Sequence, residues 1–128
     1  NYEGLIQKLG IQNDFFLVGE LKNSHQYMKG FDVFTLSSRY EGVSISLIEA
    51  LYAGIPILAS NVGGNTDVVG NSQDQLFVLD DFDDYISKLA DIKRNREAII
   101  KFNTSLKQRF SLDSMMNRYK HLFEELNK

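Results

Sequence analysis

Two acidic residues, Glu41 and Glu49, have the type and spacing that best suit binding chemistry in this chain. Glu41 follows an apolar run and precedes Gly42, so we expect its carboxylate to project from a turn over the edge of a sheet. Ser44 or Ser46 can cap the helix that begins there, and the free N–H groups of such a helix start bind anions. Glu49 lies on the face of that helix that still reaches the turn. Because ionised carboxylates only accept hydrogen bonds, the pattern predicts a ligand with hydroxyl groups on either side of a phosphate, as in a nucleotide-sugar.

The same residue types also fit interpretations without a ligand. Ser46 and Glu49 have the spacing of a capping box, in which Glu49 returns a hydrogen bond to the backbone N–H of Ser46. Glu41 alone fits a solvated acid in a turn. The two histidines, His25 and His121, are isolated, and we expect both to be structural or solvated. Spacing by itself therefore leaves a ligand site and a plain helix cap both open.

Short apolar runs alternate with helical patterns over the first 92 residues. Because these runs are continuous, both faces of the strands are expected to be covered, as in a parallel sheet with helices on each side. We therefore expect an α/β fold, with a Rossmann-like parallel sheet that binds ligands outside the carboxyl ends of its strands. The predicted strands are 15–18, 32–36, 55–59 and 76–79, and the predicted helices are about 2–9, 24–29, 46–53, 66–70 and 82–92.

Residues 93–128 have a different character. Two apolar stripes at helical spacing predict two helices, with Ser111 and Asp113 as caps between them. We expect them to form a C-terminal extension that packs on the domain of residues 1–92, and a helix that binds a partner or a membrane surface is the alternative. Residues 92–128 carry nine basic and four acidic side chains, against five and thirteen in residues 1–91. Solvated helix faces explain this asymmetry better than an acidic partner or anionic lipid does.

Composition excludes several classes of protein. A chain of 128 residues with 43% hydrophobic residues is enough for one globular core. The net charge of −3 is too mild to indicate nucleic acid as a partner. There is no cysteine, which excludes disulfides and thiolate metal sites and favours the cytoplasm. No apolar run approaches the roughly 18 residues that span a membrane. The chain begins at Asn1 rather than Met, so we expect a fragment of a longer protein.

The stretch 39–69 resembles the C-terminal domain of the GT-B glycosyltransferases, specifically the large retaining family called group 1 or GT4. Members carry two glutamates with seven residues between them, then Gly-x-Pro, an apolar strand and a Gly-Gly turn. The resemblance covers about residues 2–92. The residues that carry it are Glu41, Glu49, Ala50, Gly54, Pro56, Gly63 and Gly64.

The resemblance implies a role for each residue of the first half of the motif. Glu41 would hydrogen-bond the donor sugar, and Glu49 would hydrogen-bond the ribose of the nucleotide. The backbone N–H groups of Gly42, Val43 and Ser44 would meet sugar or phosphate oxygens. No metal and no cofactor is expected, because the nucleotide-sugar is the donor substrate. No residue here is a convincing general base.

The second half of the motif is implied to line the same cleft. Gly63 and Gly64, followed by Asp67 in a helix start, would form the neighbouring loop, although an ordinary glycine turn with a helix cap explains them equally well. Asp67 departs from the family, in which Glu is common at this position. Gly70 supplies only the first glycine of the turn that relatives carry before their last strand.

The largest departure lies before Asn1. Relatives begin this domain with a strand and an Arg and a Lys that neutralise the diphosphate, whereas Arg39 is the only basic residue in the motif here and is expected to be solvated. The chain is thus expected to be the donor-binding half of a retaining glycosyltransferase, inactive without the N-terminal acceptor domain of the same polypeptide. The missing strands would expose sheet edges, through which the fragment could pair with another copy.

Rival functions also fit the sequence. Other GT-B activities, such as a sugar-nucleotide epimerase or a phosphorylase, share the fold. A non-catalytic GT-B-like scaffold is the alternative from a different class. Location in the cytoplasm is expected, with peripheral association of the full enzyme at the inner face of the membrane as a further alternative.

Overall fold

The computed structural model describes residues 1–127 and has an α/β architecture around a three-stranded parallel sheet. The strands β1 (Phe34–Leu36), β2 (Ile57–Ser60) and β3 (Leu76–Phe77) lie in the order β1-β2-β3, so β2 is central. Register is set by Phe34 opposite Ile57 and by Ala59 opposite Leu76. The helices are α1 (Tyr2–Leu9), α2 (Ile45–Ala53), α3 (Gly63–Val68), α4 (Phe82–Arg94), α5 (Arg96–Leu106) and α6 (Leu112–Leu126). Short 3₁₀ helices are η1 (Ser24–Gln26), η2 (Met28–Gly30), η3 (Gln73–Gln75) and η4 (Lys107–Phe110).

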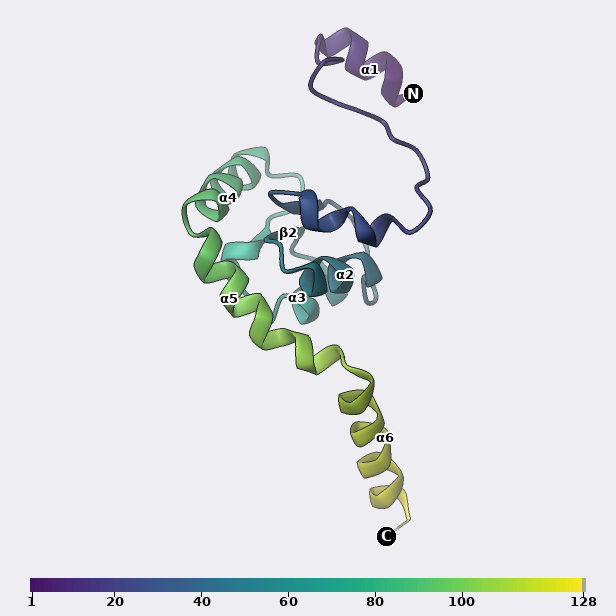
Figure 1. The fold of residues 1–128 in the computed structure, drawn as a ribbon. Helices are drawn as coiled ribbons and strands as arrows, with labels where there is room; N and C mark the ends of the chain where they lie inside the picture. The colour runs from purple at the N-terminus through teal and green to yellow at the C-terminus, as the bar shows by residue number, and fades with distance from the viewer. Residues whose placement is uncertain (128) are drawn as a thin grey trace.

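Helices cover both faces of the sheet, which confirms the predicted fold class (Figure 1). On one face, Ile57 and Ala59 pack with Leu47 and Leu51 of α2. On the other face, Leu58 packs in a second cluster with residues of α4 and α5. All four residues of β2 are buried, because successive side chains of a strand point to opposite faces and both faces here are covered.

Local chemistry sets the ends of α2. The Ser44 side chain caps its start by accepting a hydrogen bond from the Leu47 N–H at 3.4 Å. The helix stops at Gly54, whose φ of 77° is left-handed and suits glycine. Because Ser44 is the cap and Ser46 lies inside the helix, the capping-box interpretation of Ser46 and Glu49 is wrong.

Three sequence-based element assignments differ from the structure. Residues 15–18 are not a strand: they follow α1 in an exposed segment that stands away from the sheet (Figure 1). Among residues 1–127 no strand lies beside them, and a lone strand leaves its ladder groups unpaired. The helix predicted at 24–29 is instead the pair of 3₁₀ helices η1 and η2. The helix predicted to begin at residue 66 begins at Gly63, without a side-chain cap.

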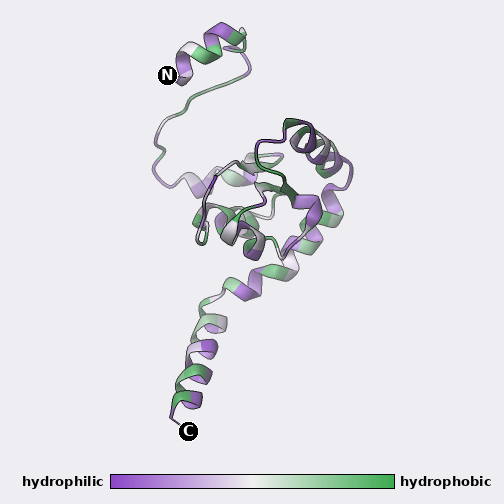
Figure 2. Ribbon diagram, turned by 180° about the vertical axis from the view of Figure 1, so that it is seen from behind, coloured by the Kyte–Doolittle hydropathy of each residue, from purple (hydrophilic) through white to green (hydrophobic). Residues whose placement is uncertain are grey.

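The C-terminal helices divide into a packed part and a projecting part. Ile99 and Leu106 of α5 are buried against the sheet domain, and Tyr52 of α2 donates a hydrogen bond to the Lys107 carbonyl of η4. By contrast, α6 has no buried residue and extends away from the domain, with apolar and polar residues on different sides (Figure 2). The predicted cap at Ser111 is confirmed, because its hydroxyl accepts from the Ser114 N–H at 3.1 Å. Among residues 1–127, no helix has the length and apolar character to cross a membrane.

A backbone contact joins the loop after β1 to the start of α3. The Gly64 N–H donates to the Glu41 carbonyl at 3.0 Å. A Cβ on Gly64 would lie 1.4 Å from the Gly42 carbonyl oxygen, and one on Gly63 would lie 2.3 Å from the Glu41 carbonyl oxygen. No side chain fits between these two turns, so the glycine pair is required by close approach.

We expect Gly64→Ala to destabilise the domain by about 3 kcal/mol, because the added methyl group collides with backbone rather than with a movable side chain. Urea unfolding followed by circular dichroism measures this loss. The matched control is Gly30→Ala, since a Cβ there meets nothing within 4 Å. Equal stability of the two variants would show that the turns are not in contact.

A buried amide pair ties α5 to η3, the 3₁₀ helix directly before β3. Gln75 donates to the Asn103 carbonyl oxygen at 2.8 Å, and Asn103 donates back to the Gln75 carbonyl oxygen at 2.9 Å. Both side chains are fully buried. Asn103→Ala should cost about 2 kcal/mol of unfolding free energy, because it leaves the Gln75 amide buried without a partner.

Denaturant unfolding of Asn103→Ala beside Asn117→Ala tests this pair. Asn117 is an exposed asparagine on α6, so its replacement should change stability by less than about 0.5 kcal/mol. A similarly small loss for Asn103→Ala would contradict the proposed contribution of the pair.

Candidate functional site

The candidate site lies where β1 and β2 end, at the carboxyl edge of the parallel sheet. A pocket of about 400 Å³ opens between the loop after β1 and the turn after β2. It is lined by Arg39, Tyr40, Glu41, Gly42, Val62 and Gly63. Two segments that are separate in the sequence therefore form one pocket, at the edge where α/β sheets hold their ligands.

Glu41 is held at this pocket through both its side chain and its backbone. Its carboxylate accepts a hydrogen bond from the Ser38 hydroxyl at 2.7 Å. Its carbonyl accepts the bond from the Gly64 N–H. The residue is half-buried, and a carboxylate oxygen remains available to a ligand donor because each oxygen has two lone pairs.

A buried polar layer lies beneath this carboxylate, and sequence reasoning missed it. The Ser60 hydroxyl, at the end of β2, donates to the Ser38 carbonyl at 2.6 Å. The Asn65 amide of α3 donates to the Ser60 carbonyl at 3.1 Å and approaches the Ser60 hydroxyl at 3.3 Å. Ser60 and Asn65 are both fully buried. The sequence signal for this layer is a serine at or just after the end of each apolar strand: Ser38 after β1 and Ser60 at the end of β2.

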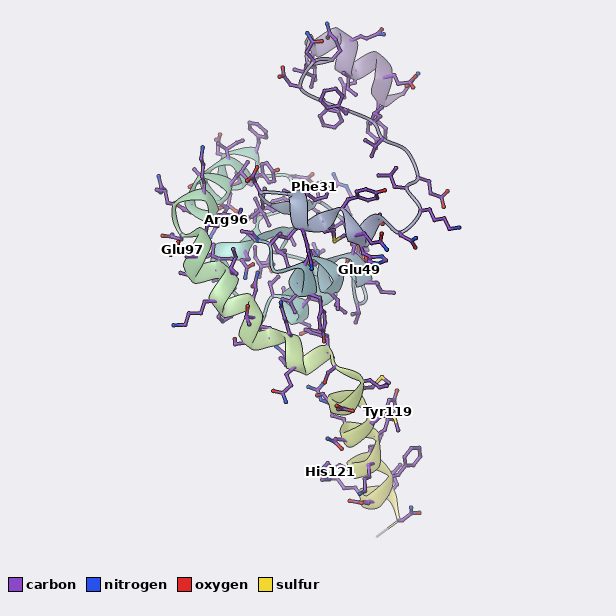
Figure 3. All side chains as sticks on the ribbon, in the orientation of Figure 1. Phe31, Glu49, Arg96, Glu97, Tyr119 and His121 are labelled. Carbon is purple, nitrogen blue, oxygen red and sulfur yellow. The ribbon has the colours of Figure 1, made fainter. Side chains whose placement is uncertain are left out.

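The structure brings together part of the predicted site. Gly42 and Gly63 line the pocket with Glu41, and Gly64 contacts the Gly42 backbone beneath it. The remaining predicted residues lie outside this lining. Val43 is 60% exposed, Ser44 is buried as the helix cap, Asp67 is exposed on α3, and Glu49 is half-buried on α2 (Figure 3).

Arg39 is paired rather than simply solvated. Its guanidinium donates to both carboxylate oxygens of Asp80, at 2.8 and 2.7 Å, in a bidentate arrangement. The pair joins the loop after β1 to the loop after β3, although its side chains are 66% and 63% exposed. The one cation that lines the pocket among the described residues is therefore already matched by a carboxylate.

The acids of the described chain do not form a metal centre. Among residues 1–127, no group of three His, Cys, Asp or Glu side chains is close enough to hold a metal ion. Of the pocket-lining residues, only Glu41 carries a carboxylate. The pocket offers hydrogen bonding by the Glu41 carboxylate, by the polar side chains of Arg39 and Tyr40, and by backbone groups.

Comparisons with known proteins show the family of this chain. Residues 1–109 match the family model described as Glycosyl transferases group 1. The Vi polysaccharide biosynthesis protein VipC/TviE of Salmonella typhi is 31% identical over 88% of the chain. The UDP-Gal:alpha-D-GlcNAc-diphosphoundecaprenol alpha-1,3-galactosyltransferase of Escherichia coli is 32% identical over 63% of the chain. The chain spans 21% of the length of each of these two relatives.

Solved structures show the same fold at lower sequence identity. HepE of Anabaena, solved in complex with UDP, superimposes with a TM-score of 0.82 at 17% identity, over 97% of this chain and 36% of that one. Sucrose-phosphate synthase of Thermosynechococcus elongatus gives a TM-score of 0.79 at 22% identity, over 98% of this chain and 33% of that one. Since the family model matches most of its length, the chain belongs to the group 1 glycosyl transferases and has the fold of a GT-B domain.

Proposed function

We propose that this chain is the donor-binding part of a retaining glycosyltransferase, which transfers a sugar from a nucleotide-sugar to an acceptor hydroxyl. The observation that carries the proposal is the placement of Glu41 in a pocket that the Gly63–Gly64 turn closes from the other side. A half-buried carboxylate beside the backbone of glycine residues suits a ligand rich in hydroxyl groups. Sugar hydroxyls donate to the carboxylate, and backbone N–H groups donate to sugar or phosphate oxygens.

In this proposal the turn and the start of α2 act on the sugar and the phosphate. Glu41 accepts hydrogen bonds from the donor sugar. The N–H groups of Gly42, Val43 and Ser44 face sugar or phosphate oxygens. At the start of α2, the Leu47 N–H donates to the Ser44 hydroxyl. The N–H groups of the two residues between Ser44 and Leu47 have no carbonyl partner within the helix. This positive end of α2 favours the phosphate charge.

Glu49 is assigned to the ribose of the nucleotide. It lies farther along α2, and its half-buried position leaves part of the side chain accessible. Because Ser44 rather than Ser46 caps the helix, Glu49 is not occupied as the acid of a capping box. Asp67 and the glycine pair belong to the neighbouring cleft loop in the same proposal.

Two relatives support a nucleotide-sugar as the donor class. The Escherichia coli relative is named for UDP-Gal, and the HepE structure was solved with UDP and also with UDP and glucose. The chain spans about a fifth of its relatives' length, which supports a second, acceptor-binding domain in the whole polypeptide. Three further points stay predictions. They are that the donor is held without a metal or cofactor, that the enzyme is cytoplasmic and meets the inner face of the membrane, and that sheet edges pair between copies.

Catalysis in such a site is positioning and electrostatic stabilisation. The bond between the anomeric carbon and the diphosphate oxygen breaks, and the diphosphate leaves with the electron pair. The acceptor oxygen bonds to that carbon, and the proton of the acceptor hydroxyl passes to the departing diphosphate. Since Arg39 is paired with Asp80, the charge of the departing diphosphate is balanced in this proposal by the positive end of α2 together with other groups of the whole polypeptide.

Glu41→Ala and Glu49→Ala should each lower nucleotide-sugar affinity about 10- to 100-fold, the expected cost of losing a hydrogen bond to a charged group. Isothermal titration calorimetry with UDP-glucose, UDP-galactose, UDP-N-acetylglucosamine and GDP-mannose measures this on the polypeptide that includes the N-terminal domain. Glu97→Ala is the matched control, because Glu97 lies on α5 at the other side of the domain from Glu49 (Figure 3). If Glu41→Ala and Glu49→Ala both leave nucleotide-sugar affinity unchanged, the assignment of the donor site is wrong.

The 128-residue chain alone should transfer no sugar, because acceptor binding and diphosphate neutralisation both require residues that it lacks. A radiolabelled-sugar transfer assay compares it with the polypeptide that includes the N-terminal domain. Detectable transfer by the purified 128-residue chain would refute this expectation.

A further inference from the structure

Glu41 lies at the end of a chain of polar contacts that runs through the edge of the sheet. The chain begins at Asn65 in α3, passes through Ser60 at the end of β2, and reaches Ser38 in the loop after β1. Ser38 then donates its hydroxyl hydrogen to Glu41. Each step from Asn65 to Ser38 crosses from one segment to another, so the contacts connect three segments that meet only in the folded domain.

Ser38 has two separate tasks in this arrangement. Its carbonyl lies beyond the end of β1, outside the strand ladder, and is satisfied by the Ser60 hydroxyl at 2.6 Å. The bond to its carbonyl fixes the backbone of Ser38, and its hydroxyl donates to the Glu41 carboxylate at 2.7 Å. A serine fixed by its backbone restricts the rotamer of the acid that it contacts.

The deepest member of the chain is Asn65 of α3. Asn65 is fully buried, and its side-chain oxygen accepts no hydrogen bond from residues 1–127. The amide nitrogen of the same side chain holds Ser60, which in turn holds Ser38.

We infer that Ser38 is a positioning residue for the donor site: its hydroxyl orients the Glu41 carboxylate toward the donor sugar, and Ser60 and Asn65 hold Ser38 in place. The inference rests on the proposed function, from which it takes the identity of the ligand. It adds that the direction of Glu41 is set by a relay from the second strand rather than by the turn alone.

The test compares Ser38→Ala, which removes the hydroxyl, with Ser38→Thr, which retains it. In the polypeptide that includes the N-terminal domain, Ser38→Ala should lower affinity for UDP-glucose or UDP-galactose about fivefold, as for loss of one oriented hydrogen bond, and Ser38→Thr should stay within about twofold of wild type. Ser37→Ala is the matched control, since Ser37 is the adjacent exposed serine and makes no side-chain hydrogen bond within residues 1–127.

A double-mutant cycle separates positioning from a structural role. In a Glu41→Ala background, Ser38→Ala should cause no further loss of affinity, because the group on which it acts is gone. A further loss of about fivefold in that background would overturn the inference. The inference also fails if Ser38→Ala in the wild-type background leaves affinity unchanged.

A readout without ligand distinguishes this inference from the proposed function. Crystal structures of the wild type, Ser38→Ala and Ser38→Thr should show the Glu41 carboxylate displaced in the alanine variant only. If the wild type binds none of the four nucleotide-sugars, the proposed function fails by itself. If the carboxylate keeps its place in Ser38→Ala, the positioning inference fails whether or not the donor binds.

Discussion

The close approach of two backbone turns is the constraint on which the site depends. The Gly64 N–H bonds the Glu41 carbonyl at 3.0 Å, and a single methyl group on Gly64 would collide with the Gly42 carbonyl oxygen. Only glycine leaves enough room for this contact. The contact sets the distance between the loop after β1 and the start of α3, and thereby the width of the pocket that carries Glu41.

The rest of the domain supports this contact from below. Parallel pairing of β1 with β2 brings both loops to one edge of the sheet, and burial of β2 on both faces holds that edge in place. Ser60 and Asn65 then satisfy polar groups where the strand ladder ends. Farther out, the exposed Arg39–Asp80 pair joins the loops after β1 and β3 at the rim, where solvent weakens its contribution. Burial thus decreases from the central strand toward the opening of the pocket.

Sequence patterns located the elements whose signals are local and strong. The helix at α2 was predicted within one residue, because the apolar face, the serine cap and the terminal glycine all agree there. The strand at 15–18 was wrong for a physical reason: its apolar residues match a buried strand, but a strand forms only where a neighbour pairs with it. The predicted capping box at Ser46 is wrong because Ser44, two positions earlier, is the N-cap residue of α2.

By itself, the sequence determined the identity of the chemical groups: Glu41, Glu49, the glycine pair and the α/β class that places ligands at a sheet edge. Residue type and spacing carry that information because helix caps, turns and apolar periods are set by neighbours in the chain. Only the tertiary structure decided which of these groups meet. The bonds from Ser60 to Ser38 and from Gly64 to Glu41 join segments whose distance depends on the pairing of β1 with β2. No local pattern encodes such a distance, because it arises from packing of the sheet as a whole.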